Sequence, residues 1–171
     1  MTKEIIEKLQ SLTLLYAEDE EGIRKNIADS LGYYVKEVLE ASNGQEAYEL
    51  YVQKKPDIIM TDIHMPILNG IEFVRKVRET DKTTPIIMIT AHTDKEYLFQ
   101  AIELKMEKYI VKPIELEVLF EVFKKCLDTI AFNNNILLGV DIDYSYDYDK
   151  KELKYKKEII LLNKKELSFF E

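Results

Sequence analysis

The sequence predicts an α/β fold: a doubly wound (βα)5 parallel sheet, followed at the C-terminus by a small antiparallel β appendage. Three observations lead to this prediction. Five short apolar runs alternate with segments of helical period, and two of the runs, DIIMTD (57–62) and PIIMIT (85–90), are almost continuously apolar. Beyond residue 135 the hydrophobic period changes to two, which is typical of an antiparallel strand with one solvated face.

Composition and charge limit the class of protein. The chain has 171 residues, of which 46% are hydrophobic and 33% charged, and this suits one packed domain with a short appendage. The formal charge of −8 argues against binding nucleic acid through a general positive field. The single cysteine, Cys126, excludes an internal disulfide. Without a signal peptide or an apolar run of about 20 residues, we expect a soluble, cytoplasmic protein with no membrane contact.

Five strands are expected in the parallel sheet. The second run, VKEVLE, is the least apolar, as an edge strand often is, whereas the third and fourth have the composition of central strands buried on both faces. The five predicted strands are Leu12–Ala17, Val35–Glu40, Asp57–Asp62, Pro85–Thr90 and Lys108–Val111.

Helical patterns precede the first strand and lie between the others. A short amphipathic helix is expected over residues 1–10, and apolar residues recur every fourth position from Ile23 to Leu31. Capping residues mark the next starts: Ser42 and Asn43 precede one helix, and Asp94 precedes another that runs to about Leu104. A last helix is predicted from Glu115 to about Phe132.

A polar hinge, Asn133–Asn135, is expected to end that helix and to close a domain over residues 11–132. Residues 136–171 then form an incomplete antiparallel segment with strands at 142–148, 152–155 and 158–162. A final helix opens near Lys164 and stops at Glu171 just as its apolar face begins, so we expect that the chain is cut.

Polar residues follow the carboxyl ends of four predicted strands. Because those ends share one edge of a parallel sheet, we expect Glu18, Asp19, Asp62, Thr90 and Lys112 to converge there. Three close carboxylates repel one another, and Mg²⁺ (or Mn²⁺) would relieve that repulsion. An anion held by a cation, an ammonium group and a hydroxyl is most simply a phosphoryl group, and a carboxylate nucleophile would form an aspartyl phosphate.

Four segments resemble the receiver domain of two-component response regulators, the family of the chemotaxis protein CheY. They are LLYAEDE (14–20), PDIIMTDIHMPILNG (56–70), IIMITAH (86–92) and YIVKPI (109–114), and the resemblance covers residues 11–131. It implies a flavodoxin-like strand order 2-1-3-4-5 and a cis peptide before Pro113. It also implies a switch that catalyses only its own phosphorylation and dephosphorylation, and is not otherwise an enzyme.

The same resemblance assigns roles to individual residues. Asp62 corresponds to the phosphoacceptor, which takes a phosphoryl group from a sensor histidine kinase. Glu18, Asp19, Asp62 and the backbone carbonyl of His64 correspond to the Mg²⁺ ligands. Thr90 and Lys112 correspond to the hydroxyl and ammonium groups that meet the phosphoryl oxygens, and Tyr109 to a rotating aromatic switch. His64 and His92 occupy positions that tune dephosphorylation in this family.

Simpler interpretations remain open for several of these residues. The Glu18-Asp19 pair could cap a helix, Lys112 could be a solvated lysine before a turn, and Tyr109 could be a half-buried core residue. His64 and His92 could be exposed loop side chains. The aspartates between residues 141 and 149 resemble a calcium loop but lack its glycine and glutamate, so a solvated strand face is favoured.

The C-terminal segment resembles the start of an OmpR/PhoB-type winged-helix effector domain, through IILLNKKELSFFE (159–171). No recognition helix is present, and 7 lysines against 8 acidic residues in 136–171 predict no DNA binding by the segment itself. We therefore expect DNA binding only in a longer protein. A homodimer is also expected through the face formed by the fourth helix (the one after Asp94), the fifth strand and the fifth helix (the one from Glu115). Residues 105–108, Lys-Met-Glu-Lys, differ from the Gly-Ala-Asp-Asp sequence that usually precedes the fifth strand in such proteins.

Three functional hypotheses follow. The first is a phosphorylation-controlled switch with transcriptional output in a full-length protein. The second is a stand-alone protein-interaction switch that acts without DNA. The third is a phosphatase with an aspartyl nucleophile, which is disfavoured because His64 stands where a second catalytic aspartate is needed. A nucleotide-binding protein of the same fold would need a glycine-rich phosphate loop, and the sequence has none.

Overall fold

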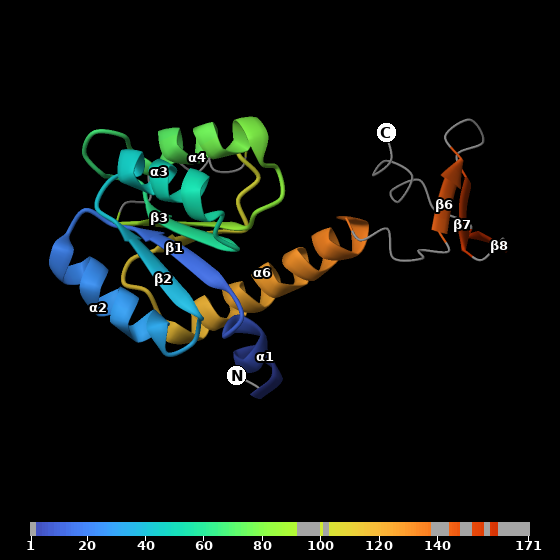
Figure 1. Cartoon of the computed structure of the whole chain (residues 1–171), viewed down its shortest axis with the longest axis horizontal. Helices are drawn as coiled ribbons and strands as arrows, with labels where there is room; N and C mark the ends of the chain where they lie inside the picture. Colours follow the sequence, from blue (N-terminus) through green and yellow to red (C-terminus); the bar gives the residue numbers. More distant parts are fainter. Residues whose placement is uncertain are drawn as a thin grey trace. The chain divides into compact units, whose positions relative to one another are not determined.

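The computed structural model describes residues 3–91, 100, 103–137, 144–147, 152–155 and 158–160. The chain divides into two compact units, Met1–Ala131 and Phe132–Glu171. The first unit contains a parallel sheet of strand order β2-β1-β3-β4-β5, so the predicted doubly wound fold and its strand order are confirmed (Figure 1). Among the described residues, no helix is long and apolar enough to cross a bilayer.

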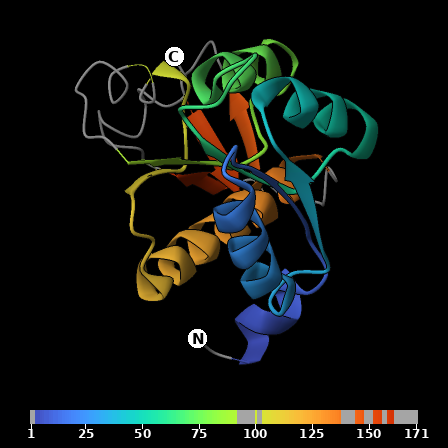
Figure 2. The ribbon, with the colours of Figure 1, turned by 90° about the vertical axis from the view of Figure 1, so that its left-hand side faces the viewer.

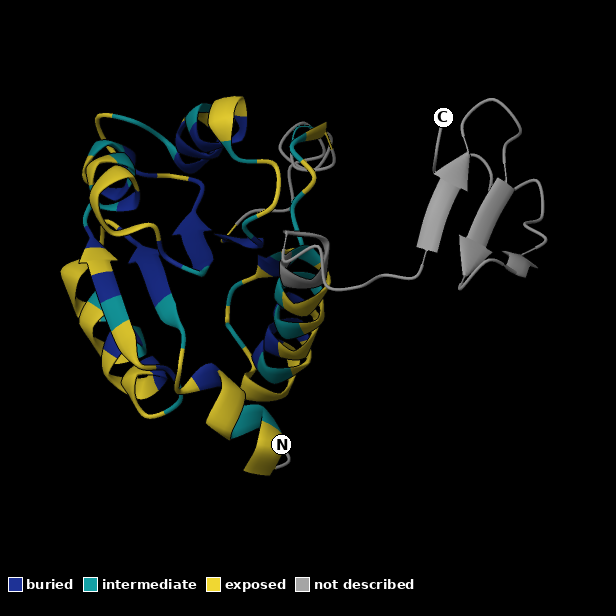
Figure 3. Cartoon of the chain, turned by 45° about the vertical axis from the view of Figure 1, so that its right-hand side comes forward, coloured by how far each residue is buried: buried dark blue, intermediate teal, exposed yellow. Residues whose placement is uncertain are grey.

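The strands lie close to their predicted positions. They are β1 (Thr13–Ala17), β2 (Glu37–Ala41), β3 (Ile58–Asp62), β4 (Ile86–Thr90) and β5 (Lys108–Val111). Every residue of β3 and β4 is buried, and β2 is an edge strand, as their compositions predict (Figure 3). β2 begins later than predicted because the amides of Tyr34 and Val35 donate to the Leu31 carbonyl at the end of the preceding helix.

Helices cover both faces of the sheet (Figure 2). The described helices are α1 (Lys3–Leu9), α2 (Glu21–Gly32), α3 (Gly44–Lys54), α4 (Gly70–Thr80) and α6 (Leu116–Leu137), whose last residues belong to the second unit. Side chains from α1, α2 and α6 pack on one face with Leu14 and Tyr16 of β1. Those from α3 and α4 pack on the other face with Leu15 and Ala17, because successive strand side chains point to opposite faces.

Side-chain caps fix where two helices begin. Asn43 accepts a hydrogen bond of 2.9 Å from the Glu46 amide, which confirms the predicted N-cap of α3. α4 begins with a full capping box, in which Asn69 accepts from the Glu72 amide and Glu72 accepts from the Asn69 amide. Both helix starts are thereby held at the carboxyl edge of the sheet.

α6 continues through the three asparagines to Leu137, so the prediction that Asn133–Asn135 ends the helix is wrong. Asparagine disfavours a helix by less than about 1 kcal/mol per residue, and neither glycine nor proline interrupts this segment. The helix predicted after Asp94 and the helix predicted from Lys164 lie largely or wholly outside the described residues.

The second unit contains a three-stranded antiparallel sheet of order β6-β7-β8. Its strands are β6 (Tyr144–Asp147), β7 (Glu152–Tyr155) and β8 (Glu158–Ile160), and Tyr144 pairs with Tyr155 while Leu153 pairs with Ile160. The side chains of the aspartates considered for calcium lie outside the described residues.

The junction between β3 and α4 requires glycine at position 70. A Cβ atom there would overlap the backbone carbonyl oxygen of Asp62, and the Gly70 amide donates a 2.9 Å hydrogen bond to the Ile63 carbonyl. We predict that Gly70→Ala lowers the free energy of unfolding by about 1–3 kcal/mol, as overpacking does, when measured by urea denaturation.

Gly22 in α2 is the matched control, because a Cβ atom there meets nothing within 4 Å. Gly22→Ala should leave stability unchanged or raise it by up to about 1 kcal/mol, through the better helix propensity of alanine. Equal unfolding midpoints for the two variants would contradict the proposed clash.

Candidate functional site

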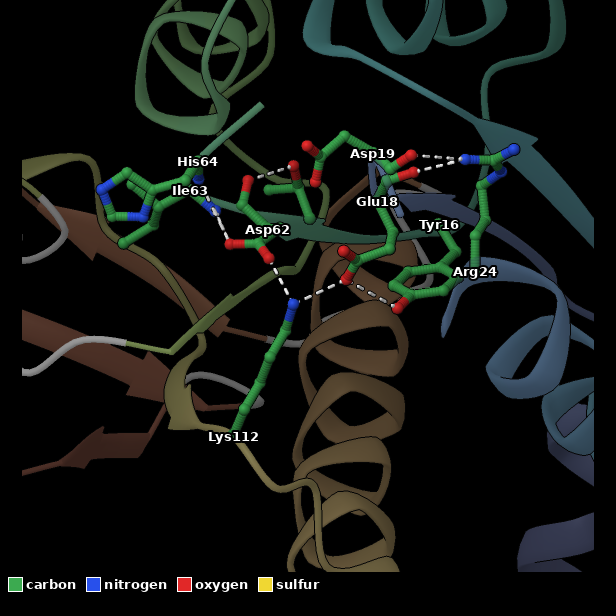
Figure 4. A network of polar contacts seen from close by, with 9 residues as sticks. Tyr16, Glu18, Asp19, Arg24, Asp62, Ile63, His64 and Lys112 are labelled. Atoms are coloured by element: carbon green, nitrogen blue, oxygen red, sulfur yellow. Dashed lines mark hydrogen bonds and ion pairs between the residues drawn. The ribbon is translucent and has the colours of Figure 1, made fainter. Parts of the chain in front are cut away.

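The predicted polar residues lie at the carboxyl edge of the sheet, and Figure 4 shows four of them, Glu18, Asp19, Asp62 and Lys112. Glu18 and Asp19 follow β1, Asp62 ends β3, Thr90 ends β4 and Lys112 follows β5. The parallel register places these ends at one level, since Ala17 pairs with Thr61, Asp62 with Ile89 and Thr90 with Val111. The topology therefore gathers residues that are up to 94 positions apart in sequence.

Three carboxylates form the acidic part of the site. One oxygen each from Glu18, Asp19 and Asp62 lies within 4.8 Å of the others. Glu18 is fully buried, Asp62 is 5% exposed and Asp19 is exposed to solvent. The cluster thus has two carboxylates shielded from water and a third at its open side.

Lys112 brings the positive charge. Its Nζ lies 2.8 Å from Glu18 Oε2 and also contacts Asp62 Oδ2, and its side chain is only 19% exposed. The Lys112 amide donates to the Thr90 carbonyl at 2.7 Å, and the Lys112–Pro113 peptide is cis, as the family resemblance implies. The interpretation of Lys112 as a solvated lysine before a turn is therefore wrong.

Backbone groups orient the Asp62 carboxylate. Its Oδ1 accepts hydrogen bonds from the amides of Ile63 at 2.5 Å and His64 at 3.2 Å, while Oδ2 contacts Lys112. Thr61 donates from its hydroxyl to the Asp62 carbonyl at 2.9 Å. Both carboxylate oxygens are thus held in place, although the carboxylate is close to two others.

Burial and the ion pairs act in opposite directions on the pKa values here. Burial raises the pKa of Glu18, and the nearby Asp62 charge adds to this, while Lys112 opposes it. For Lys112, burial lowers the pKa, but its bonds to Asp62 and Glu18 outweigh burial and raise it. The lysine therefore stays protonated at neutral pH, and its ammonium group pairs with two of the three carboxylates, Glu18 and Asp62.

The donor set fits a small divalent cation. Among the described residues, Glu18 Oε1 is buried without a hydrogen-bond partner. A buried acceptor without a partner destabilises the fold, and a bound cation would remove that penalty. Carboxylate oxygens are the ligands that Mg²⁺ prefers, and the exposed Asp19 leaves one side for water ligands. The residues that could hold the cation are Glu18, Asp19 and Asp62.

The alternative role for the acidic pair is not seen. The N-cap of α2 is Glu20, whose side chain makes no capping hydrogen bond, and neither Glu18 nor Asp19 occupies that position. Cys126 is fully buried in the core, where burial raises the pKa of its thiol to about 12, in line with a packing role.

Thr90, Tyr109, His64 and His92 are the remaining predicted residues. Thr90 is buried at the end of β4, and Tyr109 is half-buried and packs on the face covered by α3 and α4. His64 is exposed beside Asp62, whereas His92 lies outside the described residues. The structure thus brings Thr90 to the carboxyl edge, while Tyr109 lies further back along β5 and pairs with Met88.

Two residues that contact the site were missed in the sequence. Arg24 of α2 donates to the backbone carbonyls of Glu18 at 2.7 Å and Asp19 at 3.3 Å, and pairs with Glu40 at 3.6 Å. Tyr16 donates from its hydroxyl to Glu18 Oε2 at 3.2 Å. The signal for Tyr16 was its position two residues before Glu18 on one strand, which places both on the same face.

Comparisons with known proteins agree with this geometry. The family model described as "Response regulator receiver domain" matches residues 14–124. The probable transcriptional regulator ycf27 of Guillardia theta is 32% identical over 164 residues, covering 92% of this chain and 64% of the relative. The phosphate regulon transcriptional regulatory protein PhoB of Pseudomonas aeruginosa is 39% identical over 103 residues, covering 59% and 45%.

A solved structure is similar as well. The receiver (REC) domain of AraT, a response regulator from Geobacillus stearothermophilus, superposes with a TM-score of 0.65 at 30% identity, covering 72% of this chain and 98% of that domain. By contrast, this chain spans about half the length of the curated relatives it matches.

Metal binding should stabilise the fold. Asp19 is a suitable position to test this, because an exposed side chain can be replaced without disturbing the core. We predict that Mg²⁺ at ten times its dissociation constant raises the unfolding free energy of the wild type by about 1.4 kcal/mol. Asp19→Asn should remove most of this gain without lowering metal-free stability, because the substitution relieves carboxylate repulsion. Thermal unfolding with and without Mg²⁺ measures both effects.

Asp29→Asn, an exposed aspartate on α2, is the control and should retain the full Mg²⁺ effect. If both aspartate variants respond to Mg²⁺ like the wild type, the cation does not bind at this cluster.

Proposed function

The chain belongs to the response regulator receiver domain family, and from that premise we propose that Asp62 accepts a phosphoryl group from a sensor histidine kinase. The observation that supports this most directly is the fixed Asp62 carboxylate, which is buried and contacts Lys112 within the acidic cluster. The acidic pair, the terminal hydroxyl of β4 and the lysine after β5 all surround the position where a phosphoryl group would sit.

The proposed chemistry is a group transfer to a carboxylate. An Asp62 oxygen attacks phosphorus, the phosphorus–nitrogen bond of the donor phosphohistidine breaks, and the histidine nitrogen keeps the electron pair. The product is an acyl phosphate on Asp62. When bound, Mg²⁺ supplies positive charge against the carboxylates and the phosphoryl oxygens. Glu18, Asp19, Asp62 and the His64 backbone carbonyl would hold it.

Lys112 and Thr90 respond to the new group. Phosphorylation replaces one carboxylate charge by about two negative charges and adds acceptor oxygens. Lys112, which now bridges Glu18 and Asp62, would turn to the phosphoryl group, and the Thr90 hydroxyl would donate to another of its oxygens. Tyr109 would then move from its half-buried position. This movement would shift the population between two conformations of the surface around β5.

The output we propose is transcriptional control by a longer protein. The ycf27 match covers 92% of this chain, so it extends beyond the receiver into residues 132–171, and that relative is a probable transcriptional regulator. The small antiparallel sheet of the second unit, which follows the receiver in sequence, supports an effector domain that begins with such a sheet. A protein-interaction switch without DNA binding is the alternative, and in both cases His64 and His92 would tune dephosphorylation.

Covalent phosphorylation can be measured directly. Incubation with acetyl phosphate and Mg²⁺ should add about 80 Da to the intact mass of the wild type, the mass of one phosphoryl group. Asp62→Asn should show no gain, since the amide is not a nucleophile, and omission of Mg²⁺ should strongly slow the gain in the wild type.

The matched control is Asp57→Asn, at the other end of the same run, where the Asp57 carboxylate accepts a 2.8 Å hydrogen bond from the Thr13 amide. This variant should gain the same mass as the wild type. A gain of mass in Asp62→Asn, or none in the wild type with either acetyl phosphate or phosphohistidine donors, would contradict the proposal.

Phosphorylation is also proposed to drive a homodimer through the β5 and α6 face. Exposed charges of both signs gather there, from Lys108 on β5 and from Glu117, Glu121 and Lys125 on α6, around a shallow hollow that includes Val118. Such a mixed-charge surface can be self-complementary in a twofold dimer, because each basic group can meet an acidic group of the other copy.

We predict that phosphorylated wild-type protein sizes as a dimer by light scattering, whereas Glu121→Lys stays monomeric but still gains about 80 Da. An exposed acidic residue on another helix, Glu49→Lys on α3, is the control and should still dimerise. Dimerisation of Glu121→Lys to the wild-type extent would place the interface elsewhere.

A further inference from the structure

Tyr16 is a buried polar side chain that no step described above uses. Its ring lies in the core on the face covered by α2 and α6, fully shielded from solvent. Its hydroxyl reaches the carboxyl edge of β1 and donates to Glu18 Oε2 at 3.2 Å (Figure 4). A leucine or valine would fill the core at this position without adding a hydroxyl, so the hydroxyl needs an account of its own.

The strand geometry explains why the two side chains meet. Tyr16 and Glu18 are two residues apart at the end of β1, so they point to the same face of the sheet. Lys112 enters from the loop between β5 and α6, which packs on that same face. Tyrosine and lysine therefore approach the same glutamate oxygen from two directions, as the dashed lines of Figure 4 show.

The two carboxylate oxygens of Glu18 differ in their hydrogen-bond partners. Oε2 receives the Tyr16 hydroxyl at 3.2 Å and the Lys112 ammonium at 2.8 Å. Oε1, among the described residues, is buried without a hydrogen-bond partner, although its carboxylate lies in the acidic cluster. One oxygen is thus fixed by the protein, and the other remains available as a ligand.

We propose that Tyr16 is a positioning residue for the divalent cation: its hydroxyl holds Glu18 Oε2 so that Oε1 faces the metal. This inference rests on the cation site of the proposed function. A hydrogen bond to the non-ligating oxygen of a metal-binding carboxylate limits its rotation, and loss of such an outer contact typically weakens metal affinity 10- to 100-fold.

Glutamate makes this contact more important than aspartate would. The extra methylene adds a rotatable bond, and ordering that bond disfavours metal binding unless another contact has already fixed it. Tyr16 also matters more after phosphorylation. Lys112 would then turn to the phosphoryl group, and of these two donors Tyr16 would continue to hold Glu18 Oε2.

Replacing tyrosine by phenylalanine tests the hydroxyl alone. In Tyr16→Phe the ring still fills the core, and we expect the dissociation constant for Mn²⁺, followed by the electron paramagnetic resonance signal of the free ion, to rise about tenfold. Tyr51→Phe is the matched control: Tyr51 is also buried, and its hydroxyl donates at 3.0 Å to Asp81, which follows α4 at the opposite edge of the sheet. Its Mn²⁺ affinity should stay within about twofold of the wild type.

Kinetics separate positioning from a general loss of structure. With acetyl phosphate, Tyr16→Phe should need about tenfold more Mg²⁺ for half-maximal phosphorylation and reach a maximal rate within about twofold of the wild type. An unchanged Mn²⁺ affinity, a lower maximal rate without a shift in Mg²⁺ dependence, or the same loss in Tyr51→Phe would each overturn the inference.

The two proposals fail in distinguishable ways. If the wild type binds Mn²⁺ and Tyr16→Phe weakens that binding, but neither gains mass from a phosphoryl donor, the positioning role of Tyr16 stands and the phosphoacceptor role of Asp62 falls. If the wild type binds no Mn²⁺ at this cluster, the inference about Tyr16 falls by itself, whether or not Asp62 is phosphorylated.

Discussion

Electrostatic imbalance at one edge of the sheet is the constraint on which the rest of this structure depends. In the part of the chain that the structure describes, Glu18 and Asp62 are buried and share the Lys112 ammonium group, Asp19 is exposed beside them, and Glu18 Oε1 is buried without a hydrogen-bond partner. Close carboxylates repel one another, so the scaffold must hold them in place, and a bound cation would relieve the repulsion. In the function proposed above, a phosphoryl group on Asp62 would draw the Lys112 ammonium group away from the carboxylates.

The scaffold resists the repulsion through backbone contacts as much as through side chains. Amides of Ile63 and His64 hold one oxygen of Asp62, and Arg24 anchors the carbonyls of Glu18 and Asp19 from the adjacent helix. The absence of a side chain at Gly70 lets α4 begin directly against the end of β3. These contacts preorganise the carboxylates, so that little of the binding free energy of a cation or phosphoryl group is lost in ordering them.

Switching in this fold requires that a local change at the acidic cluster alter a distant face. Lys112 is well placed to transmit it, because its ammonium lies in the cluster, its amide pairs with the last residue of β4, and it joins β5 to α6. β5 is an edge strand with Lys108 and Val111 exposed, so its outer face can change with little disturbance of the core. A modification at the cluster that moved Lys112 would therefore bias the surface formed by β5 and α6.

The sequence by itself determined the doubly wound fold, the central position of β3 and β4, and the convergence of Glu18, Asp19, Asp62, Thr90 and Lys112 at the carboxyl edge. These follow from hydrophobic period and from residues that directly end strands, which are local properties. Only the tertiary structure decided that Tyr16 donates to Glu18, that Arg24 holds the acidic pair, and that Lys112 bridges two carboxylates. It also decided that α6 passes through Asn133–Asn135. The three contacts depend on how far side chains extend between packed helices and strands, and the length of α6 depends on small differences in helix propensity. The hydrophobic pattern of the sequence contains neither kind of information.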